Sequence, residues 1–355
     1  MSAPTRPNPT ILDVAAHAGV SVKTVSRILN NAPNISSRMI ARVKASMEAL
    51  SFTPNQNARN LAGATDFVIA TPVISFGFQY SGYFATVQAA SSQVCEENHF
   101  GYMMQRHIGP STDLTPQNLL EVLRHRRVAG ALLLPPTADL EGLPGLLERN
   151  GIPCATISPK NPDSCRISAS LDERKAAREM AAYLLDLGHE RIGFVGGPDA
   201  HGAAKARYDG YADALKARGI TLDPALIDQG AFTAPSGREA ASRLLSQPRR
   251  PTAIMACNDE MAAGVLQQAL SLGLQIPADL SVTGFDDGPV VEFVWPRLTT
   301  VHQPIADMTM AAVRALIDTI RTPPSPGEPP VSIQFSHKLM IRESTGPAPT
   351  VRFQK

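Results

Sequence analysis

The chain has 355 residues, of which 43% are hydrophobic and 18% are charged, and its formal net charge is +1. This composition is typical of a folded protein with more than one domain, and it excludes a wholly disordered, collagen-like or coiled-coil chain. No apolar run reaches the roughly 20 residues that cross a bilayer, and the opening MSAPTRPNPT lacks the apolar core of a secretory signal. The four cysteines form no C-x-x-C pair, so their spacing predicts neither a zinc site nor a disulfide framework. We therefore expect a soluble cytoplasmic protein without a bound metal.

The charge is distributed unevenly along the chain. Residues 1–63 contain seven Lys or Arg and two acidic residues, a net charge of +5, whereas the rest of the chain has a net charge of −4. A small basic segment joined to a larger, mildly acidic one predicts that the N-terminal part meets a polyanion. A solvated basic face without a partner is the alternative that charge alone leaves open.

The basic segment has the pattern of three short helices. Thr10 is a suitable N-cap for a helix over 11–18, and Gly19 stands where a chain leaves a helix in the left-handed conformation. Ser21 can cap a second helix, and a third helix is predicted over 37–50. Because only three residues separate the first two helices, the segment predicts a helix-turn-helix.

The rest of the chain alternates between strand-like and helix-like patterns. Apolar runs of strand length occur at residues 67–74, 101–105, 129–134, 154–157, 191–195, 253–256 and 281–285. Longer helical patterns lie between them, and this alternation predicts parallel, doubly wound sheets in two Rossmann-like lobes. Ligands of such sheets bind beyond the carboxyl ends of the strands, so the cleft between the lobes is the expected pocket.

The segment TILDVAAHAGVSVKTVSRILNNAPNIS, followed by ARVKASMEALSFTPNQNARNLAG, resembles the headpiece and hinge of the LacI/GalR family of bacterial transcriptional regulators. The resemblance continues to residue 345 and implies an α/β protein with an all-α headpiece (10–53), a hinge helix (54–63) and an effector-binding and dimerisation core of periplasmic-binding-protein type (64–345). The expected lobes are 64–166 plus 289–322 and 167–288 plus 323–345, between a disordered N-terminus (1–9) and a flexible tail (346–355).

The resemblance also assigns residues that contact DNA. Val22, Lys23 and Arg27 match positions that read base edges, and an Arg–guanine pair is worth about 1–3 kcal/mol of discrimination. Leu61 matches the leucine that enters the minor groove and kinks the central base step. The other matches are the hinge residues Asn55 and Ala58 and the phosphate-contacting Thr10, Ser21, Thr24, Ser26 and Asn30. The implied partners are double-stranded operator DNA and a second copy of the chain, because two headpieces read two inverted half-sites. Repression is the common outcome in this family.

Polar side chains near the predicted strand ends indicate the effector site. Arg207 matches the arginine that fixes the effector in the family, at the start of a predicted helix, and its guanidinium suits vicinal hydroxyls or a carboxylate. The carboxylate of Asp286 can accept from two sugar hydroxyls, the amide of Asn258 can donate and accept, and Phe232 matches an aromatic residue that stacks on the ligand. The remaining expected contacts are Ser75, Phe76, Gln79 and Ser158. This set favours a sugar or a glycoside, and a purine or another small metabolite acting as corepressor is the alternative.

Two other functional classes fit the sequence less well. The run from Gly197 to Gly202 follows a predicted strand, but it continues with two alanines where a phosphate loop needs Lys-Ser/Thr. Neither G-x-G-x-x-G nor G-x-S-x-G is present, so no enzyme, catalytic residue or cofactor is predicted. A solute-binding receptor would share the two-lobed fold, but it would need a signal segment and would not need the basic helices.

Overall fold

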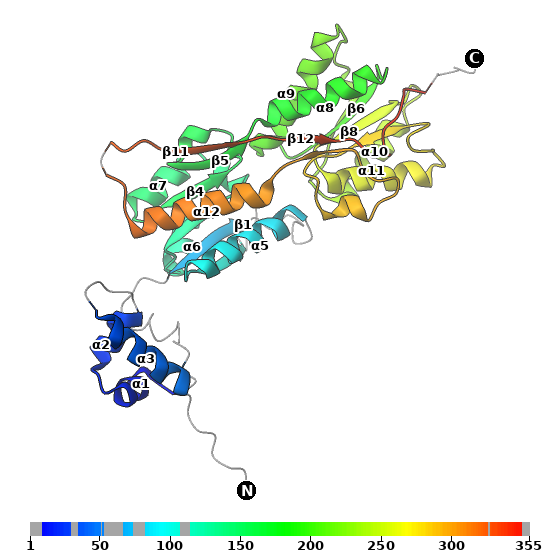
Figure 1. Ribbon diagram of the computed structural model, residues 1–355. Helices are drawn as coiled ribbons and strands as arrows, with labels where there is room; N and C mark the ends of the chain where they lie inside the picture. The colour runs from blue at the N-terminus through cyan, green and yellow to red at the C-terminus, as the bar shows by residue number, and fades with distance from the viewer. Residues whose placement is uncertain are drawn as a thin grey trace. The chain divides into compact units, whose positions relative to one another are not determined.

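The computed structural model describes residues 9–29, 35–50, 52, 67–73, 82–106, 114–325 and 327–349 (Figure 1). The chain divides into two compact units, Met1–Asp66 and Phe67–Lys355, and each is described by itself. The first eight residues, which we expected to be disordered, and the predicted hinge helix (54–63) lie outside the described residues.

The first unit contains three short helices. They are α1 (Ile11–Ala18), α2 (Val22–Leu29) and α3 (Ser37–Ala49). α1 ends at Gly19, whose left-handed conformation (φ 61°) turns the chain toward α2. Each helix contributes one fully buried valine to a single apolar cluster, namely Val14, Val25 and Val43. The predicted helix-turn-helix with a third supporting helix is therefore confirmed.

The second unit holds two lobes, each built on a parallel sheet. The first sheet has the strand order β11-β5-β4-β3-β1-β2, and all its neighbouring strands are parallel. Its strands are β1 (Val68–Val73), β2 (Gly101–Arg106), β3 (Gly130–Leu133), β4 (Cys154–Ile157), β5 (Ile167–Leu171) and β11 (Val331–Phe335). Its helices are α5 (Gly82–Glu97), α6 (Pro116–His125), α7 (Leu143–Arg149) and α12 (Ile305–Arg321). Leu132 packs in the cluster under α5 and α12, and Leu133 packs on the other face under α6 and α7. Figure 1 shows α12, in orange, beside α5 along this sheet.

The second sheet has the order β7-β6-β8-β9 and is also parallel. Its strands are β6 (Ile192–Gly196), β7 (Ile227–Gln229), β8 (Ala253–Ala256) and β9 (Ser281–Thr283), and its helices are α8 (Glu173–Asp186), α9 (Gly202–Ala217), α10 (Ala234–Leu245) and α11 (Asp259–Ser271). In each lobe the first strand lies between the second and the third, which is the doubly wound order whose switch point holds ligands. No helix in the described ranges has both the length and the apolar content needed to cross a bilayer.

The chain passes between the lobes at other points than those predicted. We expected 167–288 and 323–345 to form the second lobe, but Val331–Phe335 pairs with Ile167–Leu171 in the first sheet. The second lobe therefore begins with α8, and the last crossing follows Phe335, where β12 (Lys338–Met340) pairs antiparallel with β10 (Thr300–His302). Both segments alternate apolar and polar residues (ISASL in β5 and VSIQF in β11), so neither forms the continuous apolar run on which the strands were predicted.

Two further predicted boundaries were wrong. Thr299 still bridges to Thr283 of the second sheet, so the second crossing comes after residue 299 and not at 288. The backbone of Gly346 is hydrogen-bonded to the Ser281 side chain, and the Ala348 N–H donates to the Leu187 carbonyl at 2.9 Å. Residues 346–348 of the predicted tail (346–355) are thus anchored to the second lobe by backbone contacts, which the residue pattern does not reveal. Residues 350–355 lie outside the described residues.

Candidate functional site

The exposed start of α2 presents the predicted base-reading residues. The Ser21 hydroxyl accepts from the Thr24 backbone N–H at 3.1 Å and lies 2.8 Å from the Thr24 hydroxyl, so it caps the helix as expected. Lys23 and Arg27, one helical turn apart, are exposed, as is Val22. This surface combines two cationic side chains with an apolar one at a helix N-terminus, a set that can contact phosphates and base edges.

The other predicted DNA contacts are only partly described. Thr10 lies at the exposed start of α1, where its backbone N–H and its hydroxyl both donate to the Asp13 carboxylate at 2.7 Å. The hydrogen bond from the Thr10 hydroxyl is the main cause that lowers the pKa of Asp13. Ser26 is half-buried on α2. The remaining residues of this set, Asn30, Asn55, Ala58 and Leu61, lie outside the described residues.

A cleft lies between the two lobes at the carboxyl ends of their strands. From the first lobe it is lined by Tyr83, Phe84, Pro135 and Ser158, and from the second by Glu173, His201, Ala203, Arg207, Phe232, Asn258 and Asp286, together with Gln303 of the crossing segment. Five predicted effector residues therefore meet in one cavity. The other three, Ser75, Phe76 and Gln79, lie outside the described residues.

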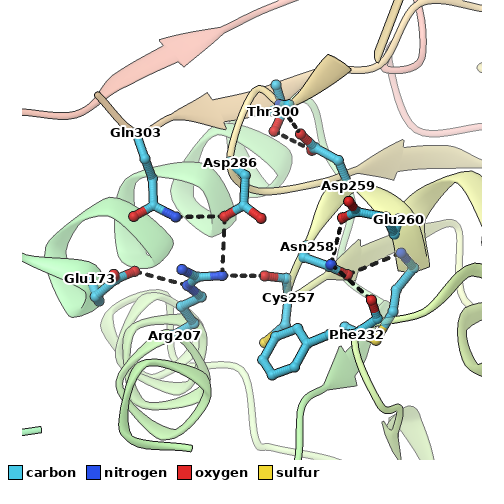
Figure 2. A network of polar contacts seen from close by, with 12 residues as sticks. Glu173, Arg207, Phe232, Cys257, Asn258, Asp259, Glu260, Asp286, Thr300 and Gln303 are labelled. Atoms are coloured by element: carbon cyan, nitrogen blue, oxygen red, sulfur yellow. Dashed lines mark hydrogen bonds and ion pairs between the residues drawn. The ribbon is translucent and has the colours of Figure 1, made fainter. Parts of the chain in front are cut away.

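Arg207 is the centre of a buried network (Figure 2). Its Nε donates to Glu173 Oε2 at 2.8 Å, and its Nη1 donates to the Cys257 carbonyl at 2.5 Å and lies 3.6 Å from Asp286 Oδ1. Burial disfavours the charged guanidinium, but the nearby carboxylates outweigh it and raise the pKa of Arg207. The position in the helix was predicted wrongly, because α9 already begins at Gly202 and places Arg207 in its second turn.

Asp286 and Asn258 have different freedom to bind a ligand. Asp286 Oδ1 accepts from Gln303 Nε2 at 2.5 Å, and burial raises the pKa of Asp286 to about 7 although Arg207 opposes the shift. The Asn258 Nδ2 donates to both the Phe232 carbonyl (3.2 Å) and Glu260 Oε2 (2.6 Å), while its oxygen caps α11. The amide of Asn258 was expected to donate to the effector, but both of its N–H groups are used within the protein.

An aromatic pair covers one side of the cleft. The rings of His201 and Phe232 lie 4.7 Å apart, centroid to centroid, and Phe232 adopts a left-handed backbone conformation (φ 57°). Gly197 makes room for this ring, since a Cβ at that position would lie 2.3 Å from Phe232 Cζ. Burial lowers the pKa of His201 to about 3, so its imidazole is neutral at physiological pH.

Sequence reasoning missed Glu173, His201 and Gln303. Glu173 is 7% exposed and follows β5 after one residue, Asp172, so it stands at a strand end like the residues that were found. The signal was present, but it was hidden because β5 itself was not predicted as a strand.

Two carboxylates connect the lobes on either side of the cleft. Asp139 of the first lobe accepts from the Gly202 N–H (2.7 Å) at the start of α9 and from the Lys160 N–H (2.6 Å). Glu260 of the second lobe accepts from the Gly82 N–H (2.9 Å) at the start of α5. Burial raises the pKa of Asp139. Both contacts place a carboxylate at a helix N-terminus, where the helix dipole favours negative charge, and together they hold the lobes closed.

Comparisons with known proteins agree with this architecture. Residues 10–55 match the family model "Bacterial regulatory proteins, lacI family", and residues 181–345 match a periplasmic binding protein-like domain. The chain is 35% identical over 343 residues to the transcriptional regulator GalR of Escherichia coli, covering 94% of this chain and 95% of GalR. It is 32% identical over 346 residues to the regulator DegA of Bacillus subtilis, covering 96% and 99%.

A solved structure shows the same fold along nearly the whole chain. The transcriptional regulator CelR in complex with cellobiose has a TM-score of 0.70 and 28% identity, over 95% of this chain and 99% of CelR. Both the headpiece and the core therefore have counterparts in the same proteins, which are transcriptional regulators. The chain belongs to the LacI family of bacterial transcriptional regulators.

Proposed function

We propose that this regulator binds a palindromic operator as a homodimer and that a sugar or a glycoside in the inter-lobe cleft controls its affinity for that DNA. As a member of the LacI family it is a helix-turn-helix transcriptional regulator and not an enzyme. One observation supports the proposal most. The exposed cationic start of α2 and the buried polar cleft are two separate sites in two separate units, as a ligand-controlled DNA reader requires.

Physical limits on a single headpiece support the dimer. One short helix reaches few base edges, so useful specificity needs two headpieces on two inverted half-sites. A two-fold dimer provides this arrangement, because the same surface of each copy meets its partner. In the proposed complex, Val22, Lys23 and Arg27 read bases, and Leu61 enters the minor groove at the centre of the operator. The protein then acts in the cytoplasm, where bacterial DNA lies.

The chemistry of the cleft supports a carbohydrate effector. Arg207 and Asp286 provide a donor and an acceptor for hydroxyl groups, and Phe232 with His201 provides an apolar wall for a sugar face. CelR, which resembles this chain, is described with cellobiose. No cofactor is part of the proposal. Effector and DNA are linked reciprocally, because each changes the affinity for the other by the same factor.

Selection of genomic DNA fragments with the purified full-length protein tests this function. Because phosphate contacts are salt-dependent, the selection is done at about 150 mM salt, with and without a panel of sugars. We expect a palindromic site with a flexible central step, whose recovery changes with one or more sugars. Recovery of random DNA under every condition would contradict sequence-specific reading. A palindrome whose recovery responds to a purine instead would retain the DNA reader and replace the effector class.

A further inference from the structure

The cleft contains buried polar atoms that the protein itself leaves without a partner. Among the described residues, Glu173 Oε1 and His201 Nδ1 are buried and have no hydrogen-bond partner. Both residues line the cleft, and the Glu173 side chain is 8% exposed. A buried acceptor without a donor costs free energy, so a pair of such atoms in one cavity indicates a ligand that completes them.

Each of the two carboxyl groups of the cleft keeps one oxygen for a ligand. Glu173 Oε2 accepts from Arg207, which leaves Oε1 for the ligand, and Asp286 Oδ1 accepts from Gln303, which leaves Oδ2. On the donor side, Arg207 uses Nε and Nη1 within the protein, its guanidinium lies over the Phe285 ring, and no hydrogen bond or ion pair joins its Nη2 to the described residues. A matching ligand therefore brings donors to these two oxygens and an acceptor to Arg207 Nη2, and hydroxyl groups do both.

The charges in the cleft point in the same direction. Glu173 and Asp286 bring two carboxyl groups against the single guanidinium of Arg207, and they outnumber its charge once the pH passes the Asp286 pKa of about 7. His201 adds no positive charge because burial lowers its pKa to about 3. Burial first, and then the charges of Asp286 and Glu173, raise the pKa of Tyr83 on the facing lobe. Because the site is desolvated, a further negative charge would meet repulsion that solvent does not screen.

We infer that the effector is an uncharged polyhydroxyl compound, one hydroxyl of which donates to Glu173 Oε1, and that Glu173 excludes its acidic counterparts such as uronates and sugar phosphates. This inference rests on the proposed function, since it specifies the ligand of the same cleft. Glu173 acts as a specificity residue in two ways: its free oxygen accepts from the neutral ligand, and its charge repels an anion.

Calorimetric titration of the full-length protein with matched pairs of compounds tests the inference. The pairs are D-glucose with D-glucuronate and glucose 6-phosphate, D-galactose with D-galacturonate, and cellobiose with cellobiuronate. We expect at least one neutral compound to bind and its acidic partner to bind about 100-fold more weakly or not at all. A preference for the acidic partner would overturn the inference and leave the sugar-controlled function standing. If no compound of either kind binds, the proposed effector class is wrong, and the inference is wrong with it.

Glu173→Gln assigns the selectivity to this side chain. The glutamine oxygen can still accept from Arg207 Nε, but its amide turns a donor toward the ligand and removes the charge. We expect neutral binding to weaken about 10- to 100-fold and the ratio of neutral to acidic affinity to fall by a similar factor. Glu190→Gln, which removes an exposed carboxylate from the same lobe, is the matched control and should leave the ratio unchanged. The ratio is independent of stability, so an unaltered ratio in Glu173→Gln would overturn the role of Glu173 even if the variant is less stable.

Discussion

In the headpiece, Lys23 and Arg27 project from the surface of α2, whereas in the cleft Arg207 and Glu173 are more than nine-tenths buried. Exposed charges suit a polyanion such as DNA, whose many phosphates supply attraction through water. A small ligand makes few contacts, so its polar groups have to be bound where water is excluded and each unpaired partner is costly. The two sites thus use charge differently. Substitution of a buried charge in the cleft should lower the stability of the core, whereas substitution of an exposed charge in the headpiece should lower DNA binding.

The largest effect is expected from Arg207→Ala. This change leaves the buried carboxylates of Glu173 and Asp286 without their cation, which costs about 3–5 kcal/mol when one partner of a buried pair is removed. Calorimetric unfolding should show a clear fall in the stability of the core. Arg174→Ala is the control, because the Arg174–Asp213 pair (2.7 Å) is exposed to solvent and exposed ion pairs contribute little to stability. Equal effects of the two substitutions would contradict the assigned difference between buried and exposed charges.

Arg27→Ala should instead affect binding and leave the fold intact. Loss of a base-reading arginine should reduce the preference for the selected operator over random DNA by about 1–3 kcal/mol, with unfolding of the headpiece little changed. Arg38→Ala removes the same charge from an exposed position at the start of α3 and should weaken binding to both DNAs alike. Gel-shift titrations on both DNAs measure the two ratios, and a uniform loss in Arg27→Ala would show that this residue contacts phosphate and not bases.

The same difference explains how much could be predicted from the sequence. The hydrogen bonds that cap the headpiece helices join residues three apart, such as Ser21 with Thr24, so the local pattern predicted α1 at its observed bounds and α3 to within one residue. In the core, Arg207 reaches Cys257 across 50 residues and Gly82 reaches Glu260 across 178. The apolar strands of the core were predicted, but the short or polar strands β5, β7, β10, β11 and β12 were not, because their pairing with distant strands stabilises them.

The closed arrangement of the lobes should be sensitive to glycine substitution. In Gly202→Ala, the added Cβ would lie 2.6 Å from Lys160 Cβ and 3.0 Å from its Cα across the cleft. Since the backbone of Lys160 cannot turn aside like a flexible side chain, the lobes should separate, at a cost of about 1–3 kcal/mol for such overpacking. Small-angle scattering should report a larger radius of gyration, and effector affinity should fall.

The control for this change is Gly145→Ala, where the nearest contact of the added Cβ is the end of the Arg149 side chain at 3.2 Å. That variant should scatter like the wild type. If Gly202→Ala also has the radius of gyration and the effector affinity of the wild type, the contact of Asp139 and Lys160 with α9 does not keep the two lobes together.

The smallest effect is expected at the exposed start of α1, in Asp13→Asn. The pKa of Asp13 is lowered from its ordinary value of 3.8 by the Thr10 hydroxyl and backbone N–H, so ionised Asp13 stabilises the folded headpiece. This contribution is fully present above pH 3.8 and is lost as the pH falls through the lowered pKa of the folded state. Thermal unfolding followed by circular dichroism should therefore give the wild type a higher midpoint temperature than Asp13→Asn at pH 7. The two midpoint temperatures should converge under strongly acidic conditions. Thr10→Val removes the hydroxyl donor and keeps the backbone donor, so its pH dependence should lie between the two. If the midpoint temperatures differ by the same amount at all pH values, Asp13 stabilises the headpiece through packing or helix propensity. Its charge would then contribute nothing, although the side chain is exposed.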